Sequence, residues 1–338
     1  YCYLIGKNKT SKNSIAKISK AIDVLFNETE LLSADRVIFS FIGGEPLLEI
    51  DLLNESVEYL TERIIAVAPK WKENYTFQIT TNGLLYNSGK VQQFICKYKD
   101  KLSISISIDG CKEKFNTSRL AIGGTQTFET VMFNVGLWTK QFDHTTTRMV
   151  ISHDDLQYVA ESALFLLKQG ISYVDMNLVV EDTWSDDDDT ILEAQLTLLA
   201  DLLLQDNIDA SKKLSLFEKD YGTDVSESNP ASPCGDYNIA VGTDGHFYFC
   251  FRFMSFSLRS NKPYAVGDIY TGIDHNRLRP LLSMDYKSVY SQECLECPTS
   301  RRCKWCAAEN YDSSDSGTIL QRPKTVCKLH ESCVKPIN

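Results

Sequence analysis

The cysteines are the residues of this sequence whose type and spacing point most directly to chemistry. Two C-x-x-C pairs, Cys294–Cys297 and Cys303–Cys306, are separated by five residues. Thiolates at this spacing are typical ligands of zinc or of an iron–sulfur cluster. Four further cysteines lie in the same C-terminal part of the chain, namely Cys234, Cys250, Cys327 and Cys333. Eight thiolates suit two four-cysteine clusters; one structural zinc ion with incidental thiols is the alternative.

Polar residues and glycines follow three predicted strands. The segments are Gly43-Gly44-Glu45, Thr81-Asn82-Gly83 and Ser107-Ile108-Asp109-Gly110. Glycine leaves the backbone bare, so a ligand can approach its N–H and C=O groups closely. The carboxylate of Glu45 could meet an ammonium group. Each segment alone is a plausible turn, but together, at one edge of a parallel sheet, they predict a pocket.

Short β-rich runs alternate with amphipathic stretches before this pattern fades near residue 213. The predicted strands are Arg36–Ile42, Tyr75–Thr81, Leu102–Ile108, Thr145–Ile151 and Tyr173–Val179. The predicted helices are Ser14–Phe26, Leu52–Ala68, Lys90–Tyr98, Phe128–Lys140, Leu156–Gln169 and Asp187–Gln205. Such alternation predicts βα units and a parallel sheet. With one more strand before Tyr1, six strands predict a partial barrel whose site lies at the carboxyl ends of the strands.

Composition and charge argue against several classes of function. The 338 residues carry 35 Lys and Arg against 45 Asp and Glu, a formal net charge of −10. This balance argues against a nucleic-acid groove, because binding phosphates needs clustered cations. No apolar run approaches the ~18 residues of a membrane span, and no signal peptide is visible. A cytoplasmic location is expected, where clustered cysteines are metal ligands rather than disulfides.

Other conspicuous residues receive structural interpretations. The acidic run Asp186–Asp189 is expected to be the solvated first turn of a helix, with a hard-cation site as the alternative. Cys96 is expected to be a small core residue of a helix, and Cys111 a structural residue near the pocket. The five histidines show no ligand spacing and receive no role. The stretch 213–233, rich in Ser, Asn, Pro and Asp, predicts a linker.

The chain resembles radical S-adenosylmethionine (SAM) enzymes with a C-terminal SPASM domain. The resemblance is carried by Tyr1-Cys2-Tyr3, by Gly43–Pro46, Thr81–Gly83 and Ser107–Gly110, and by the cysteine spacing after Cys234. It implies an α/β fold in which residues 1–212 form a partial (β/α)6 barrel with its first strand missing or truncated. Residues 213–233 would be the linker, and residues 234–338 a loop-rich SPASM iron–sulfur domain.

The resemblance implies a SAM site at the strand ends. The implied cofactor-binding residues are Gly43, Gly44, Glu45, Thr81, Asn82, Ser107 and Arg119. The two glycines and the glutamate would receive the ammonium group of SAM, and the serine its ribose or carboxylate. The arginine would bind the carboxylate, because a guanidinium fork suits that group.

The resemblance also implies three [4Fe-4S] clusters. Cys2 matches the third cysteine of the family's C-x3-C-x2-C loop, whose first two cysteines would lie upstream of Tyr1. Cys234, Cys250 and Cys306 would bind auxiliary cluster I. Cluster II would be bound by Cys294, Cys297, Cys303 and Cys327. Cys333 is the fourth ligand of cluster I, a replacement for Cys327, or free, in which case cluster I has an open iron.

The implied activity is peptide maturation. A 5′-deoxyadenosyl radical would take a hydrogen from a substrate carbon, and a cysteine sulfur would join that carbon as a thioether in a ribosomally made, Cys-rich precursor peptide. Phe249–Phe253 and Val266–Gly272 are similar to segments of maturases for CXXX-repeat and ranthipeptide precursors.

Two alternatives remain at this point. Anaerobic sulfatase maturases, which form formylglycine, place an Asp directly after the second SPASM cysteine, where this chain has Phe251. The other alternative is a metal-stabilised peptide-binding module. The expected partners are the precursor peptide and an electron donor such as flavodoxin or ferredoxin, with neither nucleic acid nor membrane.

Overall fold

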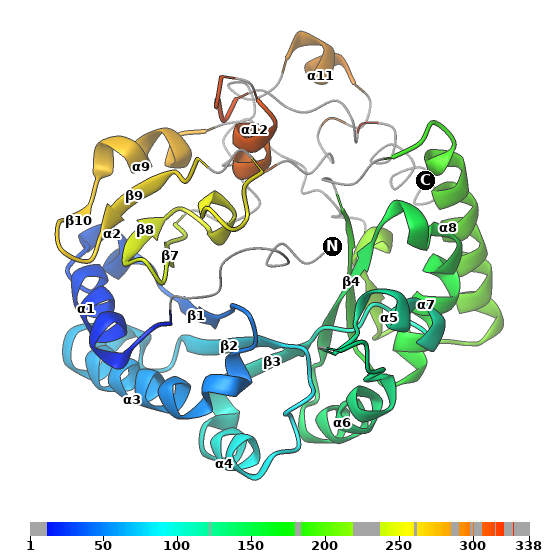
Figure 1. Ribbon diagram of the computed structural model, residues 1–338, viewed down its shortest axis with the longest axis horizontal. Helices are drawn as coiled ribbons and strands as arrows, with labels where there is room; N and C mark the ends of the chain where they lie inside the picture. Colours follow the sequence, from blue (N-terminus) through cyan, green and yellow to red (C-terminus); the bar gives the residue numbers. More distant parts are fainter. Residues whose placement is uncertain are drawn as a thin grey trace.

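The helices and strands are arranged in a ring (Figure 1). The computed structural model describes residues 12–121, 123–179, 184–218, 237–259, 262–284, 291–297, 300, 306–314, 316–320 and 327. Two parallel three-stranded sheets form the larger part of the ring, with the α-helices of that part on its outside. A C-terminal group of short elements completes it. Among the described residues, no helix is both long and apolar enough to cross a bilayer.

The first sheet has the order β1-β2-β3 and is parallel throughout. Its strands are β1 (Val37–Phe41), β2 (Tyr75–Thr81) and β3 (Leu102–Ile106). The helices of this half are α1 (Ile15–Leu25), α2 (Thr29–Ser33), α3 (Ile50–Val67) and α4 (Gly89–Tyr98), with short 3-10 turns η1 (Pro46–Glu49), η2 (Pro69–Trp71) and η3 (Lys99–Lys101). The crossovers from β1 to β2 and from β2 to β3 each contain a helix, as parallel strands require.

The second sheet has the order β4-β5-β6 and is also parallel. Its strands are β4 (Thr146–Ile151), β5 (Tyr173–Leu178) and β6 (Lys213–Leu214). The helices of this half are α5 (Lys112–Ser118), α6 (Phe128–Gln141), α7 (Val159–Lys168) and α8 (Asp188–Gln205), with the turns η4 (His153–Tyr158) and η5 (Ser215–Phe217).

In the described part of the chain, hydrogen bonds of side chains join β3 to β4, and no ladder of backbone hydrogen bonds pairs these two strands. Ser105 Oγ donates to the carbonyl of Thr146 at 2.7 Å, and Thr147 Oγ1 donates to the carbonyl of Ile106 at 2.6 Å. The same Thr147 hydroxyl accepts from the amide of Ile108 at 3.2 Å. Because residue numbers rise together in these contacts, the two strands run in the same direction. All six strands therefore present their carboxyl ends at one edge.

The two faces of the strands differ in polarity. Side chains toward the outer helices, such as Phe77, Ile104 and Met149, are buried and belong to one apolar core. Side chains on the opposite face, such as Gln78 and Arg148, are exposed. Because strand residues alternate between faces, the inner face of the ring is polar and accessible to a ligand.

The C-terminal region is a small antiparallel sheet with short helices. Its strands, in the order β10-β9-β8-β7, are β7 (Ala240–Val241), β8 (His246–Tyr248), β9 (Ala265–Asp268) and β10 (Gly272–Ile273). Its helical elements are η6 (Phe251–Phe253), α9 (His275–Leu282), α11 (Gln292–Glu296) and α12 (Ala307–Ser313). Among the described residues of this region, the buried aromatic side chains are Phe247, Tyr248, Phe249 and Phe253.

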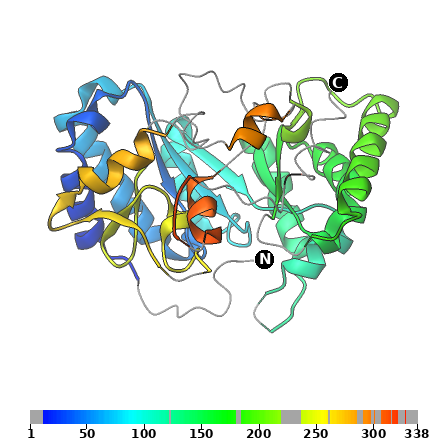
Figure 2. The same ribbon diagram turned by 90° about the horizontal axis from the view of Figure 1, so that it is seen from above.

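Helix α1 connects the barrel with the C-terminal region. Its Ile22 belongs to the barrel core, whereas the buried Ala21 belongs to the C-terminal core. Lys17 Nζ donates to the carbonyl of Thr243, and Lys20 Nζ lies 3.7 Å from the ring centre of Tyr270. Figure 2 shows the C-terminal sheet beside α1, on the side of the ring away from α7 and α8.

The five predicted strands and six predicted helices are confirmed, with ends that differ by at most three residues. Three details differ from expectation. Lys213–Leu214 pair with β5 although they open the predicted linker; residues 219–233 of that linker lie outside the described residues. The prediction for Cys96 was wrong: it is exposed, because α4 buries Val91, Phe94 and Ile95. The prediction of a solvated acidic turn was wrong for Asp188, which is buried.

Candidate active site at the carboxyl edge of the barrel strands

Glu45 ties the end of β1 to the end of β2. One carboxylate oxygen accepts from Thr81 Oγ1 at 2.7 Å and from the amide of Leu47 at 3.0 Å, and the other accepts from the amide of Asn82 at 2.8 Å. Hydrogen bonds to an ionised group are about twice as strong as neutral ones. The predicted site residues Glu45, Thr81 and Asn82 therefore lie together, and Glu45 orders the loop that contains Gly43 and Gly44.

Glycine is favoured for different reasons at different positions of this edge. Gly43 has φ +149°, in the region that favours glycine, and it is exposed like Gly44. A Cβ on either residue would meet no atom within 4 Å, so the bare backbone there is open to a ligand. Gly83, with φ +80°, lies against Ile106, whose Cγ2 would be 2.6 Å from an added Cβ. Gly83 is therefore required by packing.

Ser107 joins the same edge from β3. Its amide donates to the carbonyl of Thr81 at 2.8 Å, and its side chain is partly buried. The three predicted strand ends are thus adjacent, as the sequence predicted.

After β3, the buried Asp109 pairs with the partly buried Arg119. Arg119 Nε donates to Asp109 Oδ2 at 2.5 Å and Nη2 donates to Oδ1 at 3.1 Å, with only 1% of the Asp109 side chain exposed. Asp109 Oδ1 also accepts from the amide of Val150 in β4 at 3.1 Å. Asp109 thus holds both the guanidinium and the end of β4. From the sequence, Asp109 was expected at the end of a strand, but no role was predicted for it.

Lys114 is fully buried beside this pair. Its Nζ donates to the carbonyl of Val150 at 2.6 Å and lies 3.4 Å from Asp155 Oδ2. Burial lowers the pKa of Lys114, although the carboxylates of Asp155 and Asp109 oppose that effect. The sequence interpretation missed Lys114; the available signal was a lysine preceding the core residue Phe115 in a short helix.

His153 and Asp188 form a second pair at the carboxyl edge, after β4 and β5. His153 Nδ1 lies 2.8 and 3.0 Å from the two oxygens of Asp188. Asp188 accepts in addition from the amide of Ser185 at 2.6 Å and from its hydroxyl at 2.8 Å. Burial alone would raise the pKa of Asp188, but the hydrogen bonds from Ser185 and His153 outweigh it and lower that pKa. The sequence has no spacing of metal-ligating residues that would have indicated the pair of His153 and Asp188.

Three of the five described cysteines of the C-terminal region belong to its core or contact it. Cys250 is buried in that core, and Cys294 and Cys306 pack against it. Cys297 directly follows α11, and Cys327 is exposed. As a set of thiols at the surface of a small core, these donors fit iron–sulfur clusters in their chemistry. The predicted ligands Cys2, Cys234, Cys303 and Cys333 lie outside the described residues.

Among the described residues, one group of side chains is close enough to hold a single ion: Cys111, Glu113 and Glu161. The Cys111 thiol is buried and accepts from Ser162 Oγ at 3.5 Å, whereas both glutamates are exposed. This packing agrees with the structural role expected for Cys111.

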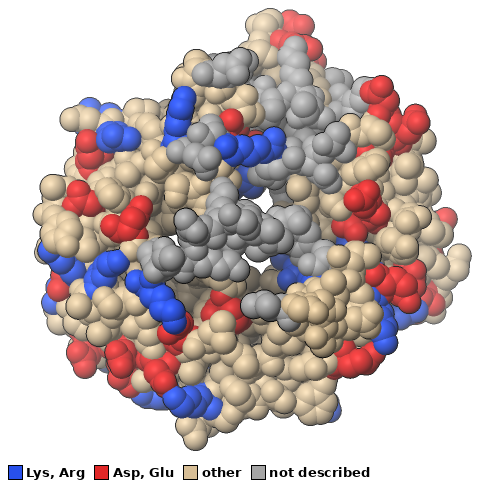
Figure 3. All heavy atoms as spheres, in the orientation of Figure 1, with Lys and Arg blue, Asp and Glu red and all other residues tan. Residues whose placement is uncertain are grey.

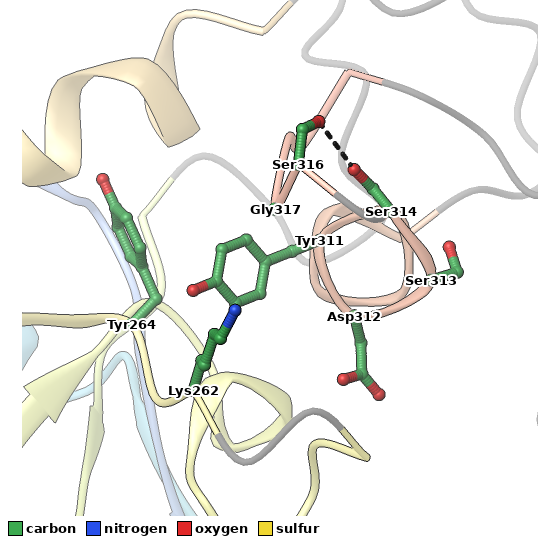
Figure 4. A pocket seen from close by; sticks show the side chains of 8 residues that line it. All are labelled: Lys262, Tyr264, Tyr311, Asp312, Ser313, Ser314, Ser316 and Gly317. Carbon is green, nitrogen blue, oxygen red and sulfur yellow. Dashed lines mark hydrogen bonds between the residues drawn. The ribbon is translucent and has the colours of Figure 1, made fainter.

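The C-terminal region contains a cavity of about 430 Å³ between Lys262, Tyr264 and the end of α12 (Figure 4). The rings of Tyr264 and Tyr311 line it at 5.7 Å and 67° to one another. Asp312, Ser313, Ser314, Ser316 and Gly317 complete the lining. Cys306 is the N-cap of α12, so this cavity lies at the opposite end of that helix from a predicted cluster ligand.

No protein-family model matches the chain. A protein of unknown function from Methanocaldococcus jannaschii is 28% identical over 182 residues, which are 53% of this chain and 57% of that protein. The match therefore spans little more than half of that relative.

Solved structures match nearly the whole chain. The anaerobic sulfatase-maturating enzyme anSMEcpe, solved with bound AdoMet, superposes with a TM-score of 0.73 at 17% identity and covers 99% of this chain and 92% of that one. SuiB of Streptococcus suis, bound to the precursor peptide SuiA, superposes with a TM-score of 0.62 at 14% identity over 96% and 71%. The chain therefore has the α/β fold of radical SAM enzymes with a SPASM domain, as its sequence predicted.

Proposed function

We propose that this chain is a radical SAM peptide maturase that forms thioether crosslinks in a Cys-rich precursor peptide. The observation that supports the peptide-maturase part of the proposal is the whole-chain likeness to anSMEcpe, which was solved with AdoMet and with the Cp18Cys peptide. The polar, accessible inner face of the barrel supports it, because a peptide needs a route to the strand ends. The proposed setting is the cytoplasm, with flavodoxin or ferredoxin as electron donor.

In this proposal, SAM binds at the carboxyl edge. The exposed backbone of Gly43 and Gly44 receives its ammonium group, and Glu45 holds that loop in place through Thr81 and Asn82. Ser107 contacts the ribose or the carboxylate. Asp109 fixes the guanidinium of Arg119 for the carboxylate. When bound, SAM with a reduced iron–sulfur cluster supplies the radical that takes hydrogen from a substrate carbon.

The proposed cluster ligands remain those of the sequence interpretation. Cys2 belongs to the SAM-binding cluster. The auxiliary clusters are held by Cys234, Cys250, Cys294, Cys297, Cys303, Cys306 and Cys327, with Cys333 as a further ligand or a free thiol. The domain limits 1–212, 213–233 and 234–338 also stay proposals, although β6 (Lys213–Leu214) pairs with the barrel strand β5.

One observation favours thioether formation over formylglycine formation. Sulfatase maturases of this family place an aspartate where this chain has Phe251. Phe251 is partly buried and packs against the C-terminal core. A side chain with this packing supports the fold of the SPASM region and supplies no carboxylate at that position. The proton of the substrate thiol must therefore go to a different group.

The test of the proposal uses the complete gene product, purified without oxygen and reconstituted with iron and sulfide. We expect it to bind SAM and to release 5′-deoxyadenosine after reduction. With the precursor peptide encoded beside its gene, the product retains its sulfur and loses two hydrogens per crosslink. Loss of sulfur from the peptide would instead indicate formylglycine, and absence of SAM cleavage would contradict the proposal.

A variant of the loop sharpens this test. Glu45→Gln removes the charge that holds Thr81 and Asn82, so we expect SAM to bind about 10–100-fold more weakly, the worth of hydrogen bonds to a charged group. Glu49→Gln is the matched control, because Glu49 is exposed and pairs with Lys12. Equilibrium dialysis with SAM measures both. Equal affinities for the two variants would contradict the proposed SAM site.

A further inference from the structure

Lys114 in α5 is a buried charge that the proposed function does not use. None of its side chain is exposed, and its Nζ donates to the carbonyl of Val150 in β4 at 2.6 Å and lies 3.4 Å from Asp155 Oδ2. Burial lowers the pKa of Lys114, but the negative charges of Asp155 and Asp109 favour its protonated form. A buried ion pair adds little stability over apolar residues of the same volume, so the position of Lys114 calls for a further reason.

Val150 connects Lys114 with the candidate active site. Its carbonyl accepts from Lys114, and its amide donates to Asp109 Oδ1 at 3.1 Å. Asp109 also accepts from Arg119 Nε at 2.5 Å and from Nη2 at 3.1 Å. Both backbone groups of one residue near the carboxyl end of β4 are therefore held by side chains of the segment that follows β3. Because the two bonds meet at Val150, loss of the first frees the end of β4 to move away from Asp109.

Helix α5 connects Lys114 with Arg119 along the chain. The helix has seven residues, Lys112–Ser118, and Arg119 is its C-cap. Isolated helices shorter than about 12 residues are marginal in water, so tertiary contacts must hold α5. At its amino end the amide of Cys111 donates to Ser162 Oγ at 3.3 Å, and one turn later Lys114 fixes the helix to β4. The place of Arg119 therefore depends on the contact that Lys114 makes.

Hydrogen bonds join this pair to the strand ends of the proposed SAM site. Ser107, two residues before Asp109, donates its amide to the carbonyl of Thr81 at 2.8 Å. Thr81 Oγ1 in turn donates to the carboxylate of Glu45 at 2.7 Å. Asp109, and with it the guanidinium of Arg119, therefore belongs to the same hydrogen-bonded edge as Glu45.

We propose that Lys114 is a positioning residue for the recognition of the SAM carboxylate. It holds α5 against the end of β4 and thereby keeps the guanidinium of Arg119 paired with Asp109, in the orientation that receives a carboxylate. Lys114 acts through Arg119 and does not contact SAM itself. The inference rests on the proposed function, because it takes Arg119 as a SAM ligand. It requires Lys114 to affect the recognition of one group of SAM and to leave the rest unaffected.

The first experiment compares two ligands of the complete gene product, reconstituted with iron and sulfide. One is SAM, and the other is decarboxylated SAM, the same sulfonium nucleotide without its carboxylate. We expect Lys114→Met to weaken the binding of SAM about 10-fold, the worth of one hydrogen bond to a charged group, and that of decarboxylated SAM less than about twofold. Equilibrium dialysis measures both affinities. A role in the fold alone would weaken both ligands by the same factor.

Three further variants control this comparison. Lys112→Met removes an exposed lysine of the same helix, which pairs with Glu129 at 2.6 Å, and should change neither affinity. Lys114→Arg keeps the cation and should restore part of the affinity for SAM. If Lys114→Met fails to fold, Asp155→Asn takes its place. This variant keeps Lys114 but removes its carboxylate partner, and it should show the same selective loss of SAM affinity to a smaller degree.

The second experiment determines whether Arg119 transmits the effect. In an Arg119→Gln background no guanidinium is left to orient, so adding Lys114→Met should change the affinity for SAM less than about twofold, because residues that act through one contact are not additive. Two independent contributions would instead add.

The outcomes distinguish this inference from the proposed function. Equal loss of both ligands in Lys114→Met, an unchanged affinity for SAM, or a full further loss in the Arg119→Gln background would overturn the role of Lys114. A wild-type enzyme that cleaves SAM but binds decarboxylated SAM equally well would also overturn it and leave the proposed function intact. A wild-type enzyme that binds no SAM would contradict the proposed function, and the inference would fall with it.

Discussion

The barrel and the C-terminal region bury different kinds of side chains. The barrel has an extensive apolar core, and the ionisable residues Asp109, Lys114, Asp155 and Asp188 are buried within it. In the described C-terminal residues, the buried polar side chains are Ser300 and Asn310, and the core is small. A large core can hold charges in fixed positions at a site, whereas a small core needs another source of stability.

The surface shows a second difference. Acidic side chains are frequent on the right-hand part of the face in Figure 3, where Figure 1 places α8. Asp187 and Asp189 lie at the start of α8, where negative charge interacts favourably with the helix dipole. Asp188, between them, turns inward to His153. Neighbouring residues of one acidic run therefore serve solubility and site geometry separately.

Removal of iron should have the largest effect, because it should lower the stability of the C-terminal region and leave that of the barrel unchanged. If clusters supply the stability that the small C-terminal core lacks, a chelator will unfold that region and leave the barrel folded. Structural zinc contributes about 10–16 kcal/mol to small domains, and we expect a loss of that order. Hydrogen exchange measures it: the amides of Phe247 and Val266 should lose protection, whereas those of Phe77 and Ile104 should keep it.

Two cysteine variants control this experiment. Cys250→Ser should reproduce the effect of the chelator, because Cys250 lies in the C-terminal core. Cys96→Ser should not, because Cys96 is an exposed residue of α4. Uniform loss of protection in both regions would show that the barrel depends on the clusters as well, and would remove the contrast.

Lys114→Met should have the next largest effect, which is a loss of stability in the barrel. It leaves Asp155 and the carbonyl of Val150 without their cation, and breaking a buried ion pair typically costs about 3–5 kcal/mol. Lys114→Arg keeps the charge and should lose less. Urea unfolding followed by tryptophan fluorescence measures the difference, since Trp71 and Trp138 are both buried in the barrel core.

The pH dependence of Lys114 has a definite sign. Because burial lowers its pKa in the folded protein below the ordinary 10.5, the unfolded chain keeps this proton to higher pH. The contribution of Lys114 to the free energy of unfolding therefore rises with pH between the pKa of Lys114 in the folded protein and the value of 10.5 in the unfolded chain. Lys114→Met should lack that rise. An identical pH profile for wild type and variant would show that Lys114 does not titrate within the window.

Much of this architecture followed from the sequence, for identifiable reasons. Runs such as Leu102–Ile106 predict a strand because apolar and polar residues alternate in them, as they do on a pleated sheet with one buried face. The strand ends Glu45, Asn82 and Ser107 met as expected, because parallel strands bring their carboxyl ends together. Strand β6 was not predicted, because its two residues are too few to show a hydrophobic periodicity.

The buried charges could not be predicted in the same way. Lys114, Asp188 and His153 are ordinary residues in their local sequence, and their roles arise from contacts across 35 or more positions of the chain. Cys96 was misplaced for the opposite reason: thiols are usually buried, but the apolar face of α4 was already complete. Position on the helix, and not residue type alone, therefore decides burial at Cys96, and tertiary contacts decide the roles of the buried charges.

The smallest predicted effect concerns the contact between the two regions. Lys20 in α1 lies over the ring of Tyr270, which is itself 79% exposed. Exposed cation–π contacts contribute about 0.5–1 kcal/mol, so Lys20→Met should lower the stability of the C-terminal region by that amount and leave the barrel unchanged. Lys101→Met is the matched control, because Lys101 lies over Tyr75 inside the barrel. The same hydrogen-exchange amides measure both variants. If Lys20→Met destabilises both regions equally, α1 couples them into one cooperative unit; if only the C-terminal amides respond, their folding remains separable.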